Sequence, residues 1–426
     1  MLWKKNQTRK PLLLQGARQV GKTYLVEVFG NKEYANFFKF NFEQDSGLGE
    51  LFKKKLNPEN IIENLSLYSG KKILSQDTLI FFDEIQAVPE VLTSLKYFHE
   101  QAPEYHIIAA GSLLGVSVAK DNSFPVGKVN FMMLYPMSFN EYLIAFGEEL
   151  LADKLQSKKD NEPLLDIIHE NLLSHLKIYL YLGGMPEVLK EYRRSRDIVL
   201  ARKIQNEILE AYSRDFSKYS DRSQAIKTSE FWHSIPRQLA KENKKFKYSL
   251  ARKNARASAF EQTIVWLKKA GLINTVYHIG TPKLPLSGYA DYTKFKVYLL
   301  DSGLLGAMLN ITSDIIVKSS KLFSEYNGAF IENYVASELV AGGVRDLHYW
   351  TSKSDAEVDF ILQHHNAIFP LEVKSGLNRN IKSLRSYAGK YHPKRIYRTS
   401  PRNFTRDDDF VNIPLYACCL MAGSEK

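Results

Sequence analysis

A glycine-rich run near the start of the chain has the residue types that bind phosphate groups. Two glycines let the backbone turn so that successive N–H groups point at one anion. The lysine that follows reaches the terminal phosphates of a nucleotide, and the next hydroxyl ligates Mg²⁺. The sequence therefore predicts a site for a nucleoside triphosphate and Mg²⁺. The residues of this loop are Gly16, Ala17, Arg18, Gln19, Val20, Gly21, Lys22 and Thr23.

The segments on either side of the loop have the patterns of a strand and a helix. Residues 12–14 are all leucine, and residues 23–29 follow a helical pattern that we expect to end at Gly30. The alternative is a chance match in an ordinary strand–turn–helix unit. The strand before the loop and the helix after it weigh against that alternative.

Two adjacent carboxylates, Asp83 and Glu84, follow a second apolar run. Residues 79–82 are all apolar, which indicates a strand that is buried on both faces. We expect Asp83 to hold the Mg²⁺ shell, and Glu84 to orient or deprotonate the attacking water, as in a Walker B element. The alternative is a solvated turn at the end of the strand.

A third strand is expected at residues 106–110, and it leads into Gly111 and Ser112. A small polar residue at the end of the strand beside Walker B is where such ATPases place a sensor of the γ-phosphate. Ser112 is our candidate for that sensor. The alternative is an ordinary Gly-Ser turn.

A second group of charged residues lies near the C-terminus. Residues 357–362 and 368–376 predict a β-hairpin, in which Asp359 faces the acid on the partner strand, Glu372, so that both bind one metal ion. Lys374 shares a face with Glu372, which places its ammonium beside the metal-bound water. Glu332, on a predicted helix, would be the third acid. This order resembles the catalytic hairpin of PD-(D/E)XK nucleases, and a cross-strand ion pair is the alternative.

Residues 228–300 predict a different kind of module. Phe231, Ile235 and Leu239 lie on one helical face, and a second helix ends near Gly271. Short strands are expected at residues 272–277 and 295–300. Helices followed by a two-stranded ribbon resemble a winged helix, which contacts either DNA or a protein partner. The basic residues in this region are Lys244, Lys245, Lys247, Arg252, Lys253 and Arg256.

The composition of the 426-residue chain is that of an ordinary globular protein, with 44% hydrophobic and 25% charged residues. The net charge of +11 is spread along the chain and fits a polyanionic partner such as nucleic acid. Cys418 and Cys419 are neighbours, so we expect buried thiols in a reducing compartment. No apolar run is long enough to span a membrane, and no signal-peptide pattern begins the chain. We expect a cytoplasmic protein without a membrane partner.

Several stretches of the chain together resemble one family. They are similar to prokaryotic AAA+-type ATPases (AAA_14) that carry a C-terminal domain of unknown function, DUF4143. In related switch-type ATPases a Gly-x-Pro step in the helical lid packs against the adenine. The resemblance therefore makes Pro186, after Gly183 and Gly184, a candidate nucleotide contact, and a plain turn between helices is the alternative. The matching stretches are residues 82–86, 94–98, 109–115, 124–129 and 134–139.

These observations predict an α/β protein in four parts. The parts are a P-loop AAA+-like ATPase core at 1–145, a helical lid at 146–225, a winged-helix-like module at 226–310 and a nuclease-like DUF4143 domain at 311–426. We expect an ATP-binding, Mg²⁺-dependent ATPase whose nucleotide state controls the C-terminal region, with DNA as the candidate target. The alternative is a slowly hydrolysing ATP/ADP switch that regulates a protein partner and has a catalytically dead nuclease-like fold.

Overall fold

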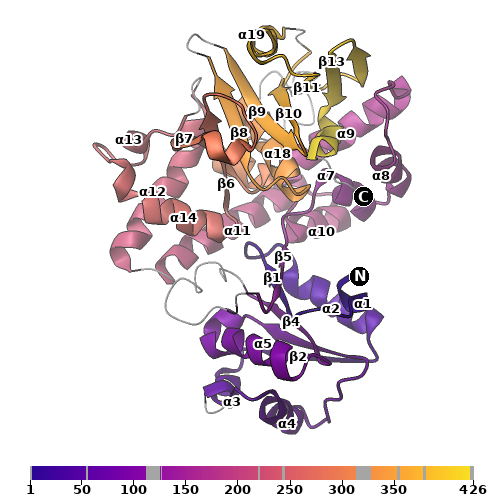
Figure 1. Ribbon diagram of the computed structural model, residues 1–426, viewed down its shortest axis with the longest axis vertical. Coiled ribbons are helices and arrows are strands. Elements are labelled where there is room, and N and C mark those ends of the chain that lie inside the picture. The colour runs from indigo at the N-terminus through magenta and orange to yellow at the C-terminus, as the bar shows by residue number, and fades with distance from the viewer. Residues whose placement is uncertain are drawn as a thin grey trace. The chain divides into compact units, whose positions relative to one another are not determined.

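The computed structural model of the chain forms two compact units (Figure 1). Unit 1 contains Met1–Tyr135 with Lys269–Gly271, and unit 2 contains Pro136–Lys268 with Leu272–Lys426. The structure describes residues 2–53, 56–111, 125, 127–218, 221–241, 245–312, 328–352, 356–377 and 380–422.

Unit 1 is built on a five-stranded sheet with the strand order β2-β3-β4-β1-β5. All neighbouring strands are parallel, so their carboxyl ends lie at one edge of the sheet. The three strands expected from the sequence at residues 12–14, 79–82 and 106–110 are confirmed. The strands are β1 (Leu12–Gln15), β2 (Asn36–Asn41), β3 (Thr78–Asp83), β4 (His106–Ala110) and β5 (Asn130–Met133).

Both faces of this sheet are covered by apolar side chains. Phe82 belongs to a core that also contains residues of α4 and α5, whereas Phe81 packs in a second core with Val26 of α2. Every residue of β3 is buried, as its continuous apolar run predicts. The helices of unit 1 are α1 (Leu2–Lys5), α2 (Lys22–Glu33), α3 (Glu50–Lys53), α4 (Pro58–Ser69) and α5 (Pro89–Gln101), with short 3₁₀ turns η1 (Ser46–Gly49) and η2 (Ile85–Ala87).

Helix α2 continues past Gly30, where we expected it to end. A Cβ atom at Gly30 would lie 2.4 Å from the Phe37 ring, so this glycine lets strand β2 approach the helix closely. The helix ends at Glu33, and Tyr34 already has an extended backbone. Glycine here serves helix–strand packing and does not terminate the helix.

Unit 2 contains an eight-stranded mixed sheet with the order β12-β13-β11-β10-β9-β8-β6-β7. The hairpin predicted around Asp359 and Glu372 is present, because β9 and β10 pair antiparallel and turn at His365 and Asn366. The strands are β6 (Ile273–Ile279), β7 (Ala290–Leu299), β8 (Leu347–Thr351), β9 (Glu357–His364), β10 (Ala367–Val373), β11 (Ile396–Ser400), β12 (Thr405–Asp407) and β13 (Phe410–Pro414).

The two-stranded ribbon expected at residues 272–300 is formed by β6 and β7, which pair antiparallel. It does not stand apart as the wing of a separate module. Val276 to Ile279 of β6 pair with Leu347 to Trp350 of β8, so the ribbon is one end of the eight-stranded sheet. The sheet therefore crosses the boundary that we expected near residue 310. The pairing satisfies the second edge of β6, which a free ribbon would leave open.

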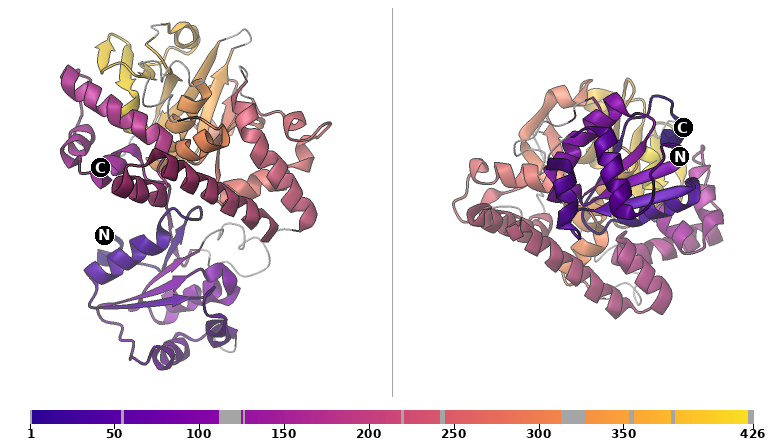
Figure 2. Two further views of the ribbon diagram at one scale, coloured as in Figure 1. Left: turned by 180° about the vertical axis from the view of Figure 1, so that it is seen from behind. Right: turned by 90° about the horizontal axis from the view of Figure 1, so that it is seen from below.

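Helices surround this sheet, and the stretch from α9 to α12 runs beside it in the views of Figure 2. Helix α18 carries Glu332 and packs against β6, β7 and β10. The helices are α7 (Phe139–Ala145), α8 (Glu149–Gln156), α9 (Asp166–Leu182), α10 (Pro186–Ser195), α11 (Ile198–Lys218), α12 (Arg222–Leu239), α13 (Tyr248–Ala251), α14 (Glu261–Lys269), α15 (Ser302–Met308), α18 (Gly328–Ala341) and α19 (Lys382–Tyr391), with 3₁₀ turns η3 (Ala257–Ala259), η4 (Leu286–Tyr289) and η5 (Leu415–Ala422).

The Gly-Gly-Met-Pro step forms a turn between α9 and α10. Gly183 has a φ of 72°, and Pro186 is the first residue of α10, where its missing N–H costs nothing. The Gly184 N–H donates to Asp301 Oδ2 at 2.6 Å, and the Gly184 carbonyl accepts from the Met137 N–H at 2.7 Å. These contacts fix the turn within unit 2. In the parts of the chain that the structure describes, no helix is both long and apolar enough to cross a membrane.

Candidate functional site

The loop between β1 and α2 has the backbone geometry of a phosphate cradle. Gly16 has a φ of 147°, Gln19 of 65° and Gly21 of 93°, so three of the six residues from Gly16 to Gly21 have a positive φ. A Cβ atom at Gly16 would lie 2.3 Å from the Leu134 carbonyl oxygen, which excludes any larger residue. The loop therefore needs glycine for both conformation and space.

Lys22 begins α2 and points back across the loop. Its Nζ donates to the carbonyl oxygens of Gly16 at 3.0 Å and Ala17 at 2.8 Å. Burial lowers the pKa of Lys22 to about 8, with Glu84 and Asp83 opposing the shift. An ammonium that is partly desolvated in this way interacts strongly with a polyanion placed in the loop.

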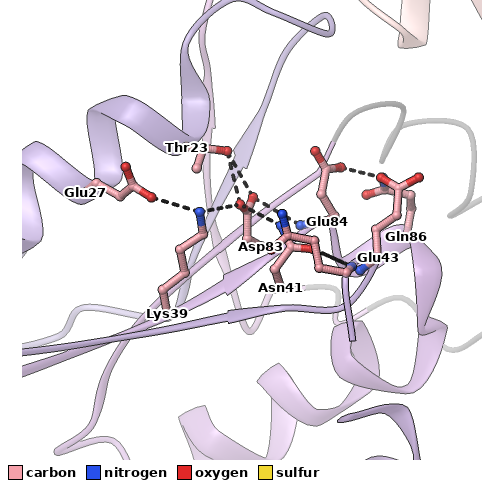
Figure 3. Close-up of polar contacts among 9 residues, drawn as sticks. Thr23, Glu27, Lys39, Asn41, Glu43, Asp83, Glu84 and Gln86 are labelled. Atoms are coloured by element: carbon pink, nitrogen blue, oxygen red, sulfur yellow. Dashed lines mark hydrogen bonds and ion pairs between the residues drawn. The ribbon is translucent and has the colours of Figure 1, made fainter. Parts of the chain in front are cut away.

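Thr23 and Asp83 come together from segments 60 residues apart in the sequence. The Thr23 hydroxyl lies 3.2 and 3.1 Å from the two carboxylate oxygens of Asp83 (Figure 3). Mg²⁺ takes few oxygen ligands from protein and completes its octahedral shell with phosphate and water oxygens. A hydroxyl and a carboxylate side by side at the loop fit that ion, and Thr23 and Asp83 are the residues that would hold it.

Two further side chains that the sequence did not single out contact Asp83. Lys39 Nζ lies 3.5 Å from Asp83 Oδ2, and Asn41 donates its amide N–H to the same oxygen at 3.3 Å (Figure 3). Burial raises the pKa of Asp83, with Glu84 adding to the shift and Lys39 opposing it. Asn41 pairs with Asp83 across the parallel strands β2 and β3, and this shared strand end is the signal that could have identified it.

Glu84 directly follows β3 and has a left-handed backbone with a φ of 54°. Its N–H donates to Asp83 Oδ1 at 3.1 Å, while its own Oε2 accepts from Gln86 Nε2 at 2.6 Å. The backbone of Glu84 therefore contacts the Asp83 carboxylate, and Gln86 orients the Glu84 carboxylate. Ser112 lies outside the described residues, so its role as a sensor stays a prediction.

Glu332, Asp359 and Glu372 lie on the expected helix and hairpin strands of unit 2, whereas Lys374 directly follows β10, which ends at Val373 and not at residue 376 as expected. Lys374 Nζ is 2.6 Å from Glu372 Oε1, and the Val373 N–H donates to Asp359 Oδ2 at 2.8 Å. Burial raises the pKa of Glu372, while Lys374 opposes the shift. Glu332 is buried on α18.

A lysine that the sequence did not single out lies among these acids. Lys296 of β7 forms ion pairs with Glu332, Glu357 and Asp359. Within the described ranges, no three His, Cys, Asp or Glu residues are grouped so that they could hold a metal ion. The signal in the sequence was a single lysine in the otherwise apolar run 295–300, because a buried lysine needs partners.

Pro186, the candidate adenine contact, belongs to unit 2, and that contact stays a prediction.

Arg214 lies on the exposed surface of α11 and pairs with Glu210 one helical turn away. This is the ordinary ion pair of a solvated helix face.

A glycine loop between a parallel strand and a helix, with Lys22 across it and Thr23 against a strand-end aspartate, defines a P-loop nucleoside triphosphatase fold. Comparison with known families agrees. Residues 8–143 match the AAA domain family, residues 327–418 match the domain of unknown function DUF4143, and residues 173–315 match another such domain, DUF8612. The chain thus joins an AAA domain to a C-terminal DUF4143 domain, and the family resemblance is confirmed.

Solved structures give distant matches. The Walker-type ATPase PABY2304 of Pyrococcus abyssi is 16% identical, with a TM-score of 0.44 over 72% of this chain and 93% of that one. The RuvB Holliday junction branch migration motor of Thermotoga maritima is 15% identical, with a TM-score of 0.30 over 66% and 85%. The Drosophila ORC bound to DNA is 15% identical, with a TM-score of 0.26 over 71% and 90%. No curated protein matches the chain.

Proposed function

We propose that this protein binds ATP with Mg²⁺ and hydrolyses it. The observation that carries the proposal is the convergence of Lys22, Thr23 and Asp83 at one end of the sheet. Lys22 would neutralise the β- and γ-phosphates, and Thr23 with Asp83 would hold Mg²⁺. The backbone N–H groups of the loop and the N-terminus of α2 would bind the remaining phosphate oxygens.

Hydrolysis needs a group that orients or deprotonates the attacking water. Glu84 fits this role, because it adjoins Asp83 and its carboxylate is held by Gln86. Ser112, which follows β4, would contact the γ-phosphate, and Pro186 would contact the adenine. When bound, Mg²⁺ would neutralise charge on the phosphates, and the residues of the loop with Glu84 would hold the nucleotide and the attacking water in position.

We further propose that the nucleotide state controls the rest of the chain and that the target is DNA. Exposed basic residues Lys247, Lys253 and Arg256 support a polyanionic partner. A second candidate function is a slowly hydrolysing ATP/ADP switch that acts on a protein partner and has a catalytically dead nuclease-like fold. The ion pair between Lys296 and Asp359 favours this alternative, because an acid engaged by a lysine is not free to bind a catalytic metal. The free thiols Cys418 and Cys419 support a reducing, cytoplasmic location.

Substitution of Lys22 tests the nucleotide site. Lys22→Ala removes the ammonium that crosses the loop, and we expect ATP affinity or turnover to fall on the order of 10²-fold or more. Lys32→Ala is the matched control, because Lys32 is an exposed lysine in the last turn of the same helix. Calorimetric titration with ATP and steady-state phosphate release measure both variants. Wild-type affinity and turnover in Lys22→Ala would contradict the proposal.

A further inference from the structure

Lys296 lies beside two of the three carboxylates that the sequence assigned to a metal ion, Glu332 and Asp359. Its side chain is fully buried. Its Nζ contacts Glu357 Oε1 directly, and it lies 3.8 Å from Glu332 Oε2 and 3.9 Å from Asp359 Oδ1. The centre of the Tyr349 ring is 4.9 Å away. Three acids from a helix and a strand therefore face one ammonium.

The same carboxylates are also held by neutral donors. The Tyr298 hydroxyl donates to Glu332 Oε2 at 2.6 Å, and the Val373 N–H donates to Asp359 Oδ2 at 2.8 Å. Asp359 Oδ1 thus faces the Lys296 ammonium, and Asp359 Oδ2 accepts a hydrogen bond from the backbone of β10. Donors on both sides fix these acids in place around the ammonium.

The fourth acid of the group has a lysine of its own. Glu372 Oε1 lies 2.6 Å from Lys374 Nζ, and the Glu372 side chain is buried while that of Lys374 is 31% exposed. In a nuclease, this lysine would act on a metal-bound water next to the two acids. Here it forms a direct ion pair with one of them, so both ammonium groups of the site are engaged by carboxylates.

The charge of Lys296 is secured by its neighbours. Burial by itself would lower the pKa of Lys296, but attraction to Glu332, Glu357 and Asp359 outweighs it, and the pKa is raised above its ordinary value. A buried charge persists only when it is paired in this way.

A divalent metal does not fit among these groups as they stand. Mg²⁺ binds carboxylate oxygens at about 2.0–2.1 Å. Among the three acids around Lys296, it would have to share Glu332 Oε2, Glu357 Oε1 and Asp359 Oδ1 with the ammonium. Two cations a few ångströms apart in a buried site repel strongly. Of the residues described, no three acids, histidines or cysteines form a metal-binding group. The observed ion pairs of Glu332 and Asp359 therefore disagree with their predicted role as metal ligands.

We propose that the Lys296 ammonium is the resident cation of this carboxylate cluster and that the cluster takes no divalent metal. The ion pairs of the cluster then join β7, β9 and α18. This inference concerns unit 2 alone and does not depend on ATP hydrolysis by unit 1.

Manganese binding to the full-length protein, without nucleotide, tests the proposal directly. Mn²⁺ titration followed by electron paramagnetic resonance counts the ions bound by the wild type and by Asp359→Asn. The asparagine oxygen can still accept from the Val373 N–H, so this variant is expected to fold. Both proteins keep the loop site of unit 1, and we expect the same number of bound ions in each. The loss of one bound Mn²⁺ in Asp359→Asn would overturn the proposal.

Removal of the ammonium gives the converse test. Lys296→Met leaves two buried acids, Glu332 and Asp359, and the partly exposed Glu357 without their cation, and we expect its Tm to fall by about 5–10 °C. Millimolar Mn²⁺ should then raise the Tm of this variant more than that of the wild type, because the acids are free to bind it. Lys296→Arg keeps the charge and Lys374→Met keeps Lys296, so neither should gain the Mn²⁺ effect.

Two further outcomes of the Lys296→Met experiment decide the proposal. If Lys296→Met keeps the wild-type Tm and shows no Mn²⁺ effect, the ammonium does not hold the cluster and the proposal fails. If Lys296→Met does not fold, the comparison of wild type with Asp359→Asn decides the question by itself.

Discussion

Lys22 is a buried lysine, and we expect the affinity for ATP to depend on whether its amine is protonated. Its pKa in the free protein is lowered to about 8 by burial. Phosphates placed beside the ammonium favour its charged form and raise that pKa again. The affinity for ATP should therefore fall as the pH rises through about 8, because binding then requires a proton to be taken up.

Calorimetry measures this proton directly. At pH 8.5, ATP titrations in buffers of different ionisation enthalpy should show net proton uptake by the wild type. Lys22→Arg provides the control, since a guanidinium stays charged over the whole range and should show no uptake from this residue. Equal uptake by the wild type and Lys22→Arg would assign the proton to another group.

Substitution of Glu84 should separate ATP binding from ATP hydrolysis. Glu84→Gln keeps the shape of the side chain but cannot accept a proton. Because Thr23, Asp83 and Lys22 are unchanged, we expect ATP affinity near that of the wild type and turnover lower by about 10²-fold or more. Single-turnover phosphate release and ATP titration measure the two quantities separately. An equal loss of affinity and turnover would make Glu84 a metal ligand or a structural residue instead.

At the scale of elements, Glu338 links α18 to the start of α7. Its Oε1 accepts from the Phe139 N–H at 2.9 Å and lies 3.4 Å from the Tyr179 hydroxyl. Burial raises the pKa of Glu338 from an ordinary 4.5 to about 7, while the bond from Phe139 opposes the shift. The folded protein thus holds this proton more tightly than the unfolded chain does. Stability from this group is fully present below pH 4.5 and is lost as the pH rises through about 7.

Glu338→Gln should remove that pH dependence. The shift corresponds to an upper limit of about 3 kcal/mol, and the glutamine oxygen can still accept from the Phe139 N–H. We therefore expect the variant to be more stable than the wild type at pH 8, with little gain at pH 4.5. Urea midpoints at the two pH values measure this. Glu187→Gln, at an exposed position on α10, is the control, and a wild-type pH profile in Glu338→Gln would exclude Glu338 as the titrating group.

The elements that could be predicted were those with local signals. Short stretches of sequence were enough to predict three of them. These are the loop at Gly16, the apolar strand that ends at Asp83 and the hairpin that carries Asp359. The pairing of β6 with β8 could not be read in this way, because it joins segments about 70 residues apart that have no shared pattern. Lys296 was missed for the same reason, since its partners lie on a helix and a strand later in the chain.

At the scale of the whole molecule, the net charge of +11 is compatible with a polyanionic partner or with basic side chains that are simply solvated. The basic residues around α13 are the local candidates. Arg252 already pairs with Glu230 at 2.7 Å, and Lys244 lies outside the described residues. The exposed residues Lys247, Lys253 and Arg256 are therefore the better choice for substitution.

If these residues contact DNA, the affinity should weaken steeply with salt, with a log–log slope of about −0.9 for each phosphate contact. Charge reversal at the three positions together should flatten the slope by up to three contacts and weaken binding for every DNA sequence alike, since phosphate contacts carry no sequence information. Fluorescence anisotropy with labelled duplex DNA from 50 to 200 mM salt measures both effects.

A second triple reversal, at the exposed lysines Lys32, Lys71 and Lys72 of unit 1, changes the net charge by the same amount. It separates a local contact from the long-range field of the molecule, because that field is screened within about 10 Å at 0.1 M salt. Flattening by the first set alone places the DNA contact around α13. Equal flattening by both sets would assign the salt dependence to net charge. An absence of DNA binding by the wild type at 50 mM salt would contradict the proposed DNA contact.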